Sequence, residues 1–306
     1  EHLLKQAAGQ IDMLAVHNAY APLVIGVSER TDPRQVYLAM LAAPQEIEAN
    51  LKEVSRLIAR HETPGRPISI AVTEWGPSFH VLPGSPWVDH VKTMGSALFV
   101  ASTLNAFLRT PRLEVANFFK LTDLGFMGWI GRRQDRWVQT APAMAFAMYR
   151  HQLGRNLVAT HIESPSFDSP GVGAMARVSR APWVDGVSTF DAGRLVLMLV
   201  NRSDTTAMAT RLQLQGVSSY AAGQVHTLAA DSLDAHTGTE LPRIPGLAWA
   251  RQIELSRFSK GAPGEVRSTT ASLAALRAAP AQGAAVDLQL PPLSITAITL
   301  SGVSLR

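Results

Sequence analysis

The feature that most constrains the fold of this chain is a change of pattern near residue 154. Before that point, three short apolar runs alternate with three segments of helical pattern. These six segments lie at residues 11–16, 35–60, 68–73, 88–109, 113–119 and 141–152. Apolar runs separated by helices are typical of a parallel sheet that is buried on both faces. We therefore expect an α/β unit over residues 1–153.

The helical segment at residues 35–60 contains a proline that bears on its continuity. After Pro44, apolar residues recur at spacings of four, three and four, which places them on one face of a helix. These residues are Ile47, Leu51, Val54 and Ile58. Proline is tolerated in the first turn of a helix, so Pro44 is expected to begin a second helical segment.

Beyond residue 154 the pattern becomes one of strands alone. Four strand-like runs, separated by turn residues, lie at residues 195–200, 209–214, 224–228 and 294–300. Short strands at such intervals predict an antiparallel β-sandwich over residues 154–306. A stretch rich in Ala, Gly and Pro at residues 259–285 is expected to be an inserted loop, with a short helix at residues 271–278.

Composition excludes several classes of protein. Hydrophobic residues make up 46% of the 306 residues and charged residues 17%, which suits a folded core rather than a disordered chain. The net charge is only +4 and no basic block stands out, so we expect no nucleic-acid partner. No apolar run reaches about 18 residues, so we expect a soluble chain with no membrane partner. The chain has no cysteine and its histidines lack metal-ligand spacing, so we expect neither a metal nor a cofactor.

The size of the α/β unit limits the architecture it can form. A closed (β/α)8 TIM barrel takes about 250 residues and eight strands. Residues 1–153 offer about three strand–helix units, so any barrel to which they belong would be represented by its last part. The chain also begins at Glu1 without an initiator methionine. We expect an N-terminal barrel half to be missing, and the cellular compartment stays open.

Glu74 is the strongest candidate for a catalytic residue. It lies where the apolar run at residues 68–73 passes into a loop that holds Trp75 and Gly76. Catalytic groups of α/β barrels come from the carboxyl ends of strands, and a carboxylate beside an aromatic residue suits work on a sugar. The alternative is a carboxylate that caps a helix or pairs with an arginine.

Other candidate residues follow the same logic. His17 and Tyr20 come directly after the first apolar run and could orient Glu74 by hydrogen bonds, or could simply cap and pack. Trp129 lies in a Gly-rich loop, where it could stack on a sugar or seal the top of the barrel. Gln139 precedes the last helix and could bind a sugar hydroxyl.

Together these segments resemble the α-L-arabinofuranosidases of glycoside hydrolase family 51. The segment from His17 to Tyr20 is similar to that family's His-x-Tyr stretch near the sixth barrel strand. Residues 70–75 are similar to its seventh-strand motif, whose Glu is the nucleophile, and residues 139–142 to the segment that supplies a substrate-binding Gln. In the second half, residues 197–203 and 290–296 are similar to its C-terminal sandwich.

The chain departs from this family in two places. The motif Asp-Glu-Trp-Asn is replaced by Thr73-Glu74-Trp75-Gly76, and the second aromatic residue after His17 is Ala19. The resemblance also implies a general acid/base Glu in an Asn-Glu pair, a hundred or more residues before the nucleophile. Because only 73 residues precede Glu74, we expect that acid/base residue to lie upstream of Glu1.

The resemblance implies a retaining glycosidase that releases terminal α-L-arabinofuranosyl residues from an arabinose-containing glycan. Glu74 would be the nucleophile, and His17, Tyr20, Trp75, Trp129 and Gln139 would bind the substrate. The chain by itself, without the acid/base residue, is expected to be nearly inactive. It is also expected to be poorly soluble or to assemble with its N-terminal part, and family members are commonly oligomeric. Two alternatives are a non-catalytic carbohydrate-binding or structural protein and a related glycosidase such as a β-xylosidase.

Overall fold

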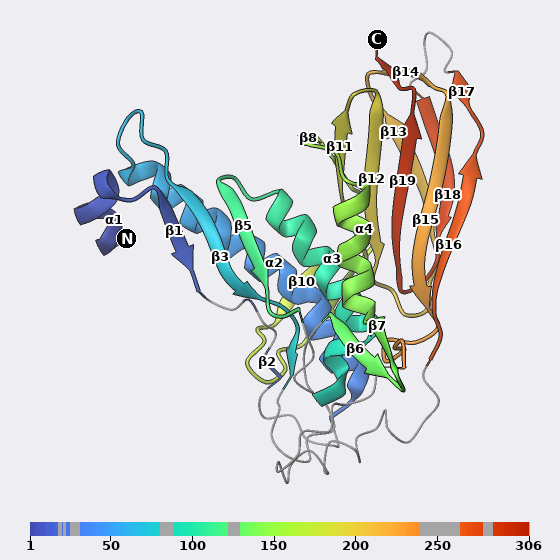
Figure 1. The fold of residues 1–306 in the computed structure, drawn as a ribbon, viewed down its shortest axis with the longest axis horizontal. Coiled ribbons are helices and arrows are strands. Elements are labelled where there is room, and N and C mark those ends of the chain that lie inside the picture. The colour runs from blue at the N-terminus through green and yellow to red at the C-terminus, as the bar shows by residue number, and fades with distance from the viewer. Residues whose placement is uncertain are drawn as a thin grey trace.

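A computed structural model describes most of the chain. The described residues are 1–17, 20, 23–24, 31–79, 88–121, 129–238, 264–277 and 284–305. Within them, the first part of the chain holds a parallel sheet with helices against one of its faces. The second part is made of antiparallel strands (Figure 1). The order from one side to the other is parallel sheet, helices and β-sandwich.

The parallel sheet has the strand order β1-β3-β5. Its strands are β1 (Met13–Val16), β3 (Ser69–Trp75) and β5 (Leu113–Phe118), which confirms the three predicted strands to within two residues at each end. A second parallel pair joins β2 (Leu23–Val24) to β4 (Ser78–Phe79). An antiparallel hairpin of β6 (Ile130–Arg133) and β7 (Arg136–Gln139) follows.

The helices of this part lie where the periodicity predicts them. They are α1 (His2–Ala7), η1 (Ala8–Gln10), α2 (Pro33–His61), η2 (Val88–Lys92), α3 (Met94–Leu108) and α4 (Ala141–Gln152). The predicted segment 88–109 is divided at Thr93, whose hydroxyl accepts a hydrogen bond from the Ser96 amide and so caps α3.

The prediction that Pro44 begins a second segment is wrong, because α2 runs without a break from Pro33 to His61. Proline removes one helical hydrogen bond, yet both halves of α2 bury residues in the same core, from Val36 to Ala42 and again at Ile47 and Leu51. The buried Arg202 donates a hydrogen bond of 2.8 Å to the Leu41 carbonyl, just before the proline. Tertiary packing therefore holds the helix together across Pro44.

The second part contains a six-stranded antiparallel sheet in the order β16-β15-β19-β12-β11-β8. Smaller groups of strands pair as β9 with β10, β13 with β18, and β17-β14-β20. Their bounds are β8 (Asn156–Val158), β9 (Ser166–Ser169), β10 (Val178–Pro182), β11 (Val184–Asp191), β12 (Arg194–Asn201), β13 (Met208–Leu214), β14 (Val217–Tyr220), β15 (Ala222–Ala230), β16 (Val266–Leu273), β17 (Leu276–Arg277), β18 (Ala284–Leu290), β19 (Ser294–Ser301) and β20 (Ser304–Leu305).

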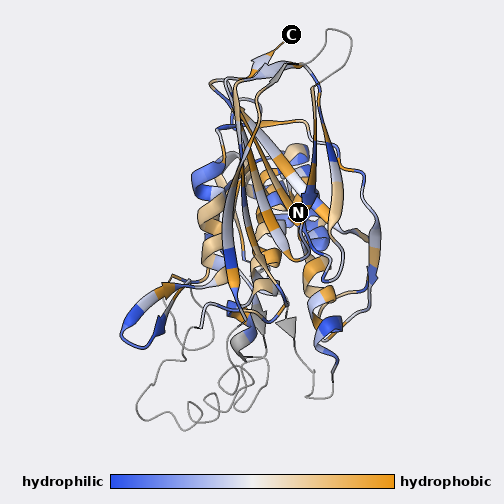
Figure 2. Cartoon of the chain, turned by 90° about the vertical axis from the view of Figure 1, so that its right-hand side faces the viewer, coloured by the Kyte–Doolittle hydropathy of each residue, from blue (hydrophilic) through white to orange (hydrophobic). Residues whose placement is uncertain are grey.

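The central strand β12 shows why this sheet is buried on both faces. Leu195, Leu197 and Leu199 pack in a cluster with β13 and β18, whereas the residues between them pack against the helices. Side chains of a strand alternate between the two faces of its sheet, so a run that is apolar at every position fits a layer covered on both sides. Apolar residues are accordingly frequent along these strands and along the helices that pack on them (Figure 2).

The predicted helix at residues 271–278 is wrong. Val266–Leu273 forms β16, which pairs with β15 over all eight of its residues, and Leu276–Arg277 forms β17. The Ala-rich sequence favours a helix locally, but the run of Ser268, Thr269 and Thr270 suits a strand, and pairing with β15 decides. Of the predicted inserted loop, residues 259–263 and 278–283 lie outside the described residues.

Candidate functional site

The site is built around an irregularity in β3. Val72 pairs with Ala116 and Trp75 with Phe118, so β3 uses three steps where β5 uses two. An extra residue of this kind is a β-bulge, which turns a side chain away from its regular face. Trp75 is thereby returned to the helix side of the sheet, where it is 1% exposed, while Thr73 and Glu74 are both partly exposed.

His17 holds the Glu74 carboxylate. Val16, the last residue of β1, pairs with Val72, which brings the next residue, His17, beside Thr73 and Glu74. The distance from His17 Nε2 to Glu74 Oε2 is 3.2 Å, and the Glu74 side chain is 32% exposed. Within the described part of the chain, the side chain that faces the Glu74 carboxylate is this histidine and not an arginine.

Thr73 completes a short hydrogen-bonded row with His17 and Glu74. The distance from His17 Nδ1 to Thr73 Oγ1 is 2.9 Å. The Thr73 hydroxyl lies 3.5 Å from the Val16 carbonyl oxygen, a longer contact than the one to Nδ1. When the hydroxyl donates to Nδ1, the ring proton lies on Nε2 and is directed at the carboxylate. The partner of one ring nitrogen thus sets the role of the other. The row fixes the orientation of Glu74 while leaving part of the carboxylate accessible to a ligand.

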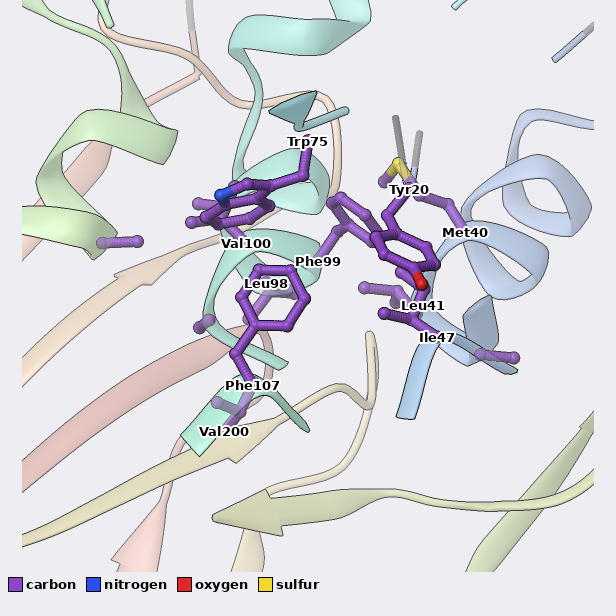
Figure 3. Packing of buried hydrophobic residues seen from close by; sticks show 14 of the residues in the cluster. Tyr20, Met40, Leu41, Ile47, Trp75, Leu98, Phe99, Val100, Phe107 and Val200 are labelled. Carbon is purple, nitrogen blue, oxygen red and sulfur yellow. The ribbon is translucent and has the colours of Figure 1, made fainter. Parts of the chain in front are cut away.

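Tyr20 lies in the core rather than in the row formed by His17, Thr73 and Glu74. Its hydroxyl donates a hydrogen bond of 2.7 Å to Asn50 Oδ1 on α2, and its ring meets Phe107 edge-on. Figure 3 shows the Tyr20 and Trp75 rings within one apolar cluster with Phe107. The sequence predicts that Tyr20 orients Glu74 by a hydrogen bond and that Trp75 binds the substrate. In the structure the Tyr20 hydroxyl instead donates to Asn50, and the Trp75 ring is buried among apolar side chains.

A row of aromatic rings links Trp75 to the hairpin and to α4. Phe118 meets Trp75 with ring centroids 5.1 Å apart, and Trp129 lies 4.6 Å from Phe118. Trp129 is also 4.2 Å from Phe146 of α4. Trp129 is half-buried in this row, so its contacts favour sealing this end of the parallel sheet over forming an exposed sugar platform.

Gln139 ends β7 and its side chain is exposed. Its backbone carbonyl accepts a hydrogen bond of 2.8 Å from the Thr237 hydroxyl, which ties the base of the hairpin to the second part of the chain. The structure therefore brings His17 and Glu74 together, places Gln139 on the hairpin, and buries Tyr20 and Trp75 beneath the site.

Sequence reasoning missed two residues of this neighbourhood. Thr73 hydrogen-bonds His17, and Asn117 is the exposed β5 residue opposite the bulge. The signal for Thr73 was its place beside the expected nucleophile at the end of a buried strand. No signal in the sequence marks Asn117, because its place depends on the register of β3 against β5.

The described residues offer no sign of a metal centre. Nowhere in them do three His, Cys, Asp or Glu side chains gather closely enough to hold a metal ion. In the same residues, no helix combines the length and apolarity needed to span a membrane. The chemistry available at this site is that of a part-exposed carboxylate oriented by a histidine, which can act as a nucleophile or as an acid or base.

Several solved structures with the same fold are α-L-arabinofuranosidases. An enzyme from Thermotoga maritima, in complex with arabinose, superposes with a TM-score of 0.69 at 18% identity, over 98% of this chain and 54% of that one. A family 51 enzyme from Xanthomonas axonopodis pv. citri gives a TM-score of 0.72 at 18% identity, over 98% and 55%. The family 51 enzyme AbfB from Bifidobacterium longum gives 0.66 at 18% identity, over 97% and 54%.

The chain thus spans about half the length of these structural relatives. A comparison of the sequence with curated proteins finds no match. The sequence model of the α-L-arabinofuranosidase C-terminal domain, however, matches residues 73–246, a segment that begins one residue before Glu74 and includes β8 to β15 of the second part. Because this match covers more than half of the 306 residues, the chain belongs to the family of α-L-arabinofuranosidase C-terminal domains and corresponds to the C-terminal portion of a family 51 enzyme.

Proposed function

We propose that this chain carries the nucleophile of a retaining α-L-arabinofuranosidase and that Glu74 is that nucleophile. The observation that carries the proposal is the pairing of Glu74 with His17 at the carboxyl ends of β3 and β1. The bulge in β3 leaves the carboxylate partly exposed there. In this position Glu74 can attack the anomeric carbon of a terminal arabinofuranosyl residue and form a covalent glycosyl-enzyme ester.

A retaining mechanism needs a second carboxyl group about 5–5.5 Å from the first. We infer that this acid/base residue lies outside residues 1–306, since the sequence has no Asn-Glu pair. Its carboxyl would protonate the leaving oxygen and then activate the water that hydrolyses the ester. Because general acid catalysis contributes about 10²–10⁴-fold, residues 1–306 alone would turn over slowly.

We further infer that β1, β3 and β5 are strands of a larger (β/α)8 barrel. The three strands are parallel, and their helices cover one face only. Met13 and Val115, on the other face, are exposed apolar side chains at positions that a barrel would turn inward. That face also carries Thr73 and Asn117, so Glu74 would stand at the carboxyl rim of the barrel, where catalytic residues of this fold lie.

The test is the hydrolysis of 4-nitrophenyl α-L-arabinofuranoside by the full-length protein. Glu74→Gln is expected to lower turnover by about 10³-fold or more. The matched control is Glu114→Gln, which removes an exposed carboxylate from β5 and should leave turnover unchanged. His17→Gln should lower turnover less than Glu74→Gln does, because His17 positions the carboxylate and does not react.

Chemical rescue separates a nucleophile from an acid or base. Sodium azide added to Glu74→Ala should restore turnover and give the arabinofuranosyl azide of inverted configuration, because azide enters the space left by the carboxylate. Near-normal turnover of Glu74→Gln would remove Glu74 from this role. Full-length protein that cleaves the corresponding β-xyloside and not the arabinofuranoside would show a related glycosidase instead.

A further inference from the structure

The β6–β7 hairpin is the strongest unexplained surface feature of the described residues. Four residues in its outer half carry charge, namely Arg132, Arg133, Asp135 and Arg136, so arginines outnumber the one carboxylate by three to one. Trp137 lies among them with 69% of its surface exposed, the highest value among the described large hydrophobic side chains. An exposed indole on a hairpin rich in arginine indicates a surface that contacts a ligand.

The register of the hairpin decides which of these side chains share a face. Arg132 pairs with Trp137, and Ile130 pairs with Gln139. Directly opposed residues of an antiparallel pair project from the same face, so Arg132, Trp137 and Gln139 lie on one side of the hairpin. We call this side the Trp137 face. Trp137 lies two residues nearer the tip of the hairpin than Gln139, which places it about 7 Å farther out along the strand.

The hairpin adjoins the end of the sheet that carries Glu74. The hairpin begins at Ile130, whose amide donates to the Leu121 carbonyl just after β5, and Trp129 packs on Phe118. In Figure 1 the hairpin accordingly lies beside the carboxyl end of β5. A chain of sugars with one branch at Glu74 could therefore continue outward over Gln139 and then Trp137.

The chemistry of the Trp137 face defines the sugar that it would hold. An indole ring offers a flat apolar surface for the face of a sugar ring, and a guanidinium group binds a carboxylate through two parallel hydrogen bonds. Arg132 is 59% exposed; its Nε donates a hydrogen bond of 3.1 Å to the Gln134 carbonyl, and its Nη2 lies 3.7 Å from the fully exposed Asp135. The contact with Asp135 is long and weak, so the two terminal nitrogens can still bind a carboxylate. An indole with a guanidinium beside it fits a sugar that carries a carboxylate.

We propose that the Trp137 face binds a uronic acid residue of the glycan whose arabinofuranosyl branch is cleaved at Glu74. This inference rests on the proposed function for the identity of the glycan. The binding itself is a separate property of the hairpin. Trp137 stacks on the uronic acid ring, and Arg132 pairs with its carboxylate.

The experiment measures the binding of α-1,4-linked trigalacturonic acid to the full-length protein by calorimetry. The ligand lacks arabinose, so the result does not depend on turnover at Glu74. Trp137→Ala and Arg132→Gln should each weaken binding about 10-fold, whereas Trp137→Phe should retain most of the affinity. Neutral α-1,4-linked galactotriose should bind at least about 10-fold more weakly than the acid, and the difference should shrink with added salt.

A matched control removes a charge elsewhere. Arg155→Gln changes an 84% exposed arginine at the start of β8, far from the hairpin, and should leave binding unchanged. Equal binding by wild type and hairpin variants would overturn the proposal, and so would equal binding of acidic and neutral trisaccharides. If Trp137→Ala leaves binding intact but changes the oligomeric state measured by analytical ultracentrifugation, the Trp137 face is an interface between copies of the protein, and the proposal fails. If Glu74→Gln keeps near-normal turnover while the protein still binds the uronic acid, the proposed function is refuted and the binding proposal stands.

Discussion

Arg109 joins the helices to the β-sandwich, and its removal tests the energetics of that junction. The residue follows α3. Its guanidinium lies 2.6 Å from Glu48 Oε2 on α2 and 2.8 Å from Asp185 Oδ1 on β11. Burial disfavours the charge on Arg109, but Glu48 and Asp185 outweigh burial, so the pKa of Arg109 is raised. Arg109→Met keeps much of the side-chain volume and leaves two half-buried carboxylates without this cation.

The size of the effect follows from these contacts. With an effective dielectric constant of about 20, each pair of charges about 4 Å apart contributes about 4 kcal/mol, and desolvation offsets several kcal/mol of the total. Lys52 still pairs with Glu48 at 2.6 Å, and Asn105 still donates to Asp185 at 3.1 Å. We therefore expect Arg109→Met to lower the free energy of unfolding by about 3 kcal/mol, the lower end for a broken buried ion pair.

The assay is urea unfolding of the full-length protein, followed by circular dichroism. Arg155→Met is the control, because its pair with Asp191 is exposed to solvent and should contribute little to stability. Adding Glu48→Met to Arg109→Met should restore about 1 kcal/mol, because one uncompensated carboxylate is removed. A loss below about 1 kcal/mol for Arg109→Met, equal to that of the control, would refute this account of the junction.

Two further measurements address single features of the helix layer. Gly95→Ala should lower the free energy of unfolding by about 2–3 kcal/mol, because its Cβ would overlap the buried ring of Tyr37. Gly9→Ala, whose Cβ would approach Thr63 Oγ1 only to 3.6 Å, should change it little, and equal effects would contradict the overpacking argument. Burial opposes the charge of Glu48, but hydrogen bonds from its two cationic neighbours outweigh burial and lower its pKa. The stability from Glu48 is therefore complete above its unfolded pKa of about 4.3 and is lost as pH falls through the lower folded value. In urea titrations the difference between wild type and Glu48→Gln should shrink steadily as pH falls below about 4, and a difference that grew there would contradict the argument.

The order of strands and helices in the first part could be read from the sequence. Apolar runs and helical stripes are local patterns, and each element buries the face that its own periodicity presents. The expected nucleophile, Glu74, could also be identified from the sequence, because a carboxylate directly after a buried strand is a local feature. His17 likewise comes directly after β1, the strand beside β3 in the sheet. Because the two strands are parallel, their carboxyl ends lie together and bring His17 to Glu74.

Long-range contacts decided the elements that were predicted wrongly. Pro44 reads as a helix start, yet packing on both sides of it keeps α2 continuous. The Ala-rich run at residues 271–278 reads as a helix, yet most of it forms β16, which pairs with β15, and β17, which pairs with β14. A proline in a helix interior costs about 3 kcal/mol, and the preference of other residues is about 1 kcal/mol per residue or less. Tertiary contacts exceed the local preference in both cases.

The sequence by itself determined which residues stand at the strand ends, because side-chain alternation and strand length are encoded locally. Only the tertiary structure decided which way those side chains point. The register of β3 against β5 inserts the bulge that exposes Glu74 and buries Trp75, and the packing of α2 draws the Tyr20 hydroxyl to Asn50. A shift of one residue in pairing reverses the face of every following side chain, and such a shift is fixed by contacts between segments that are distant in the sequence.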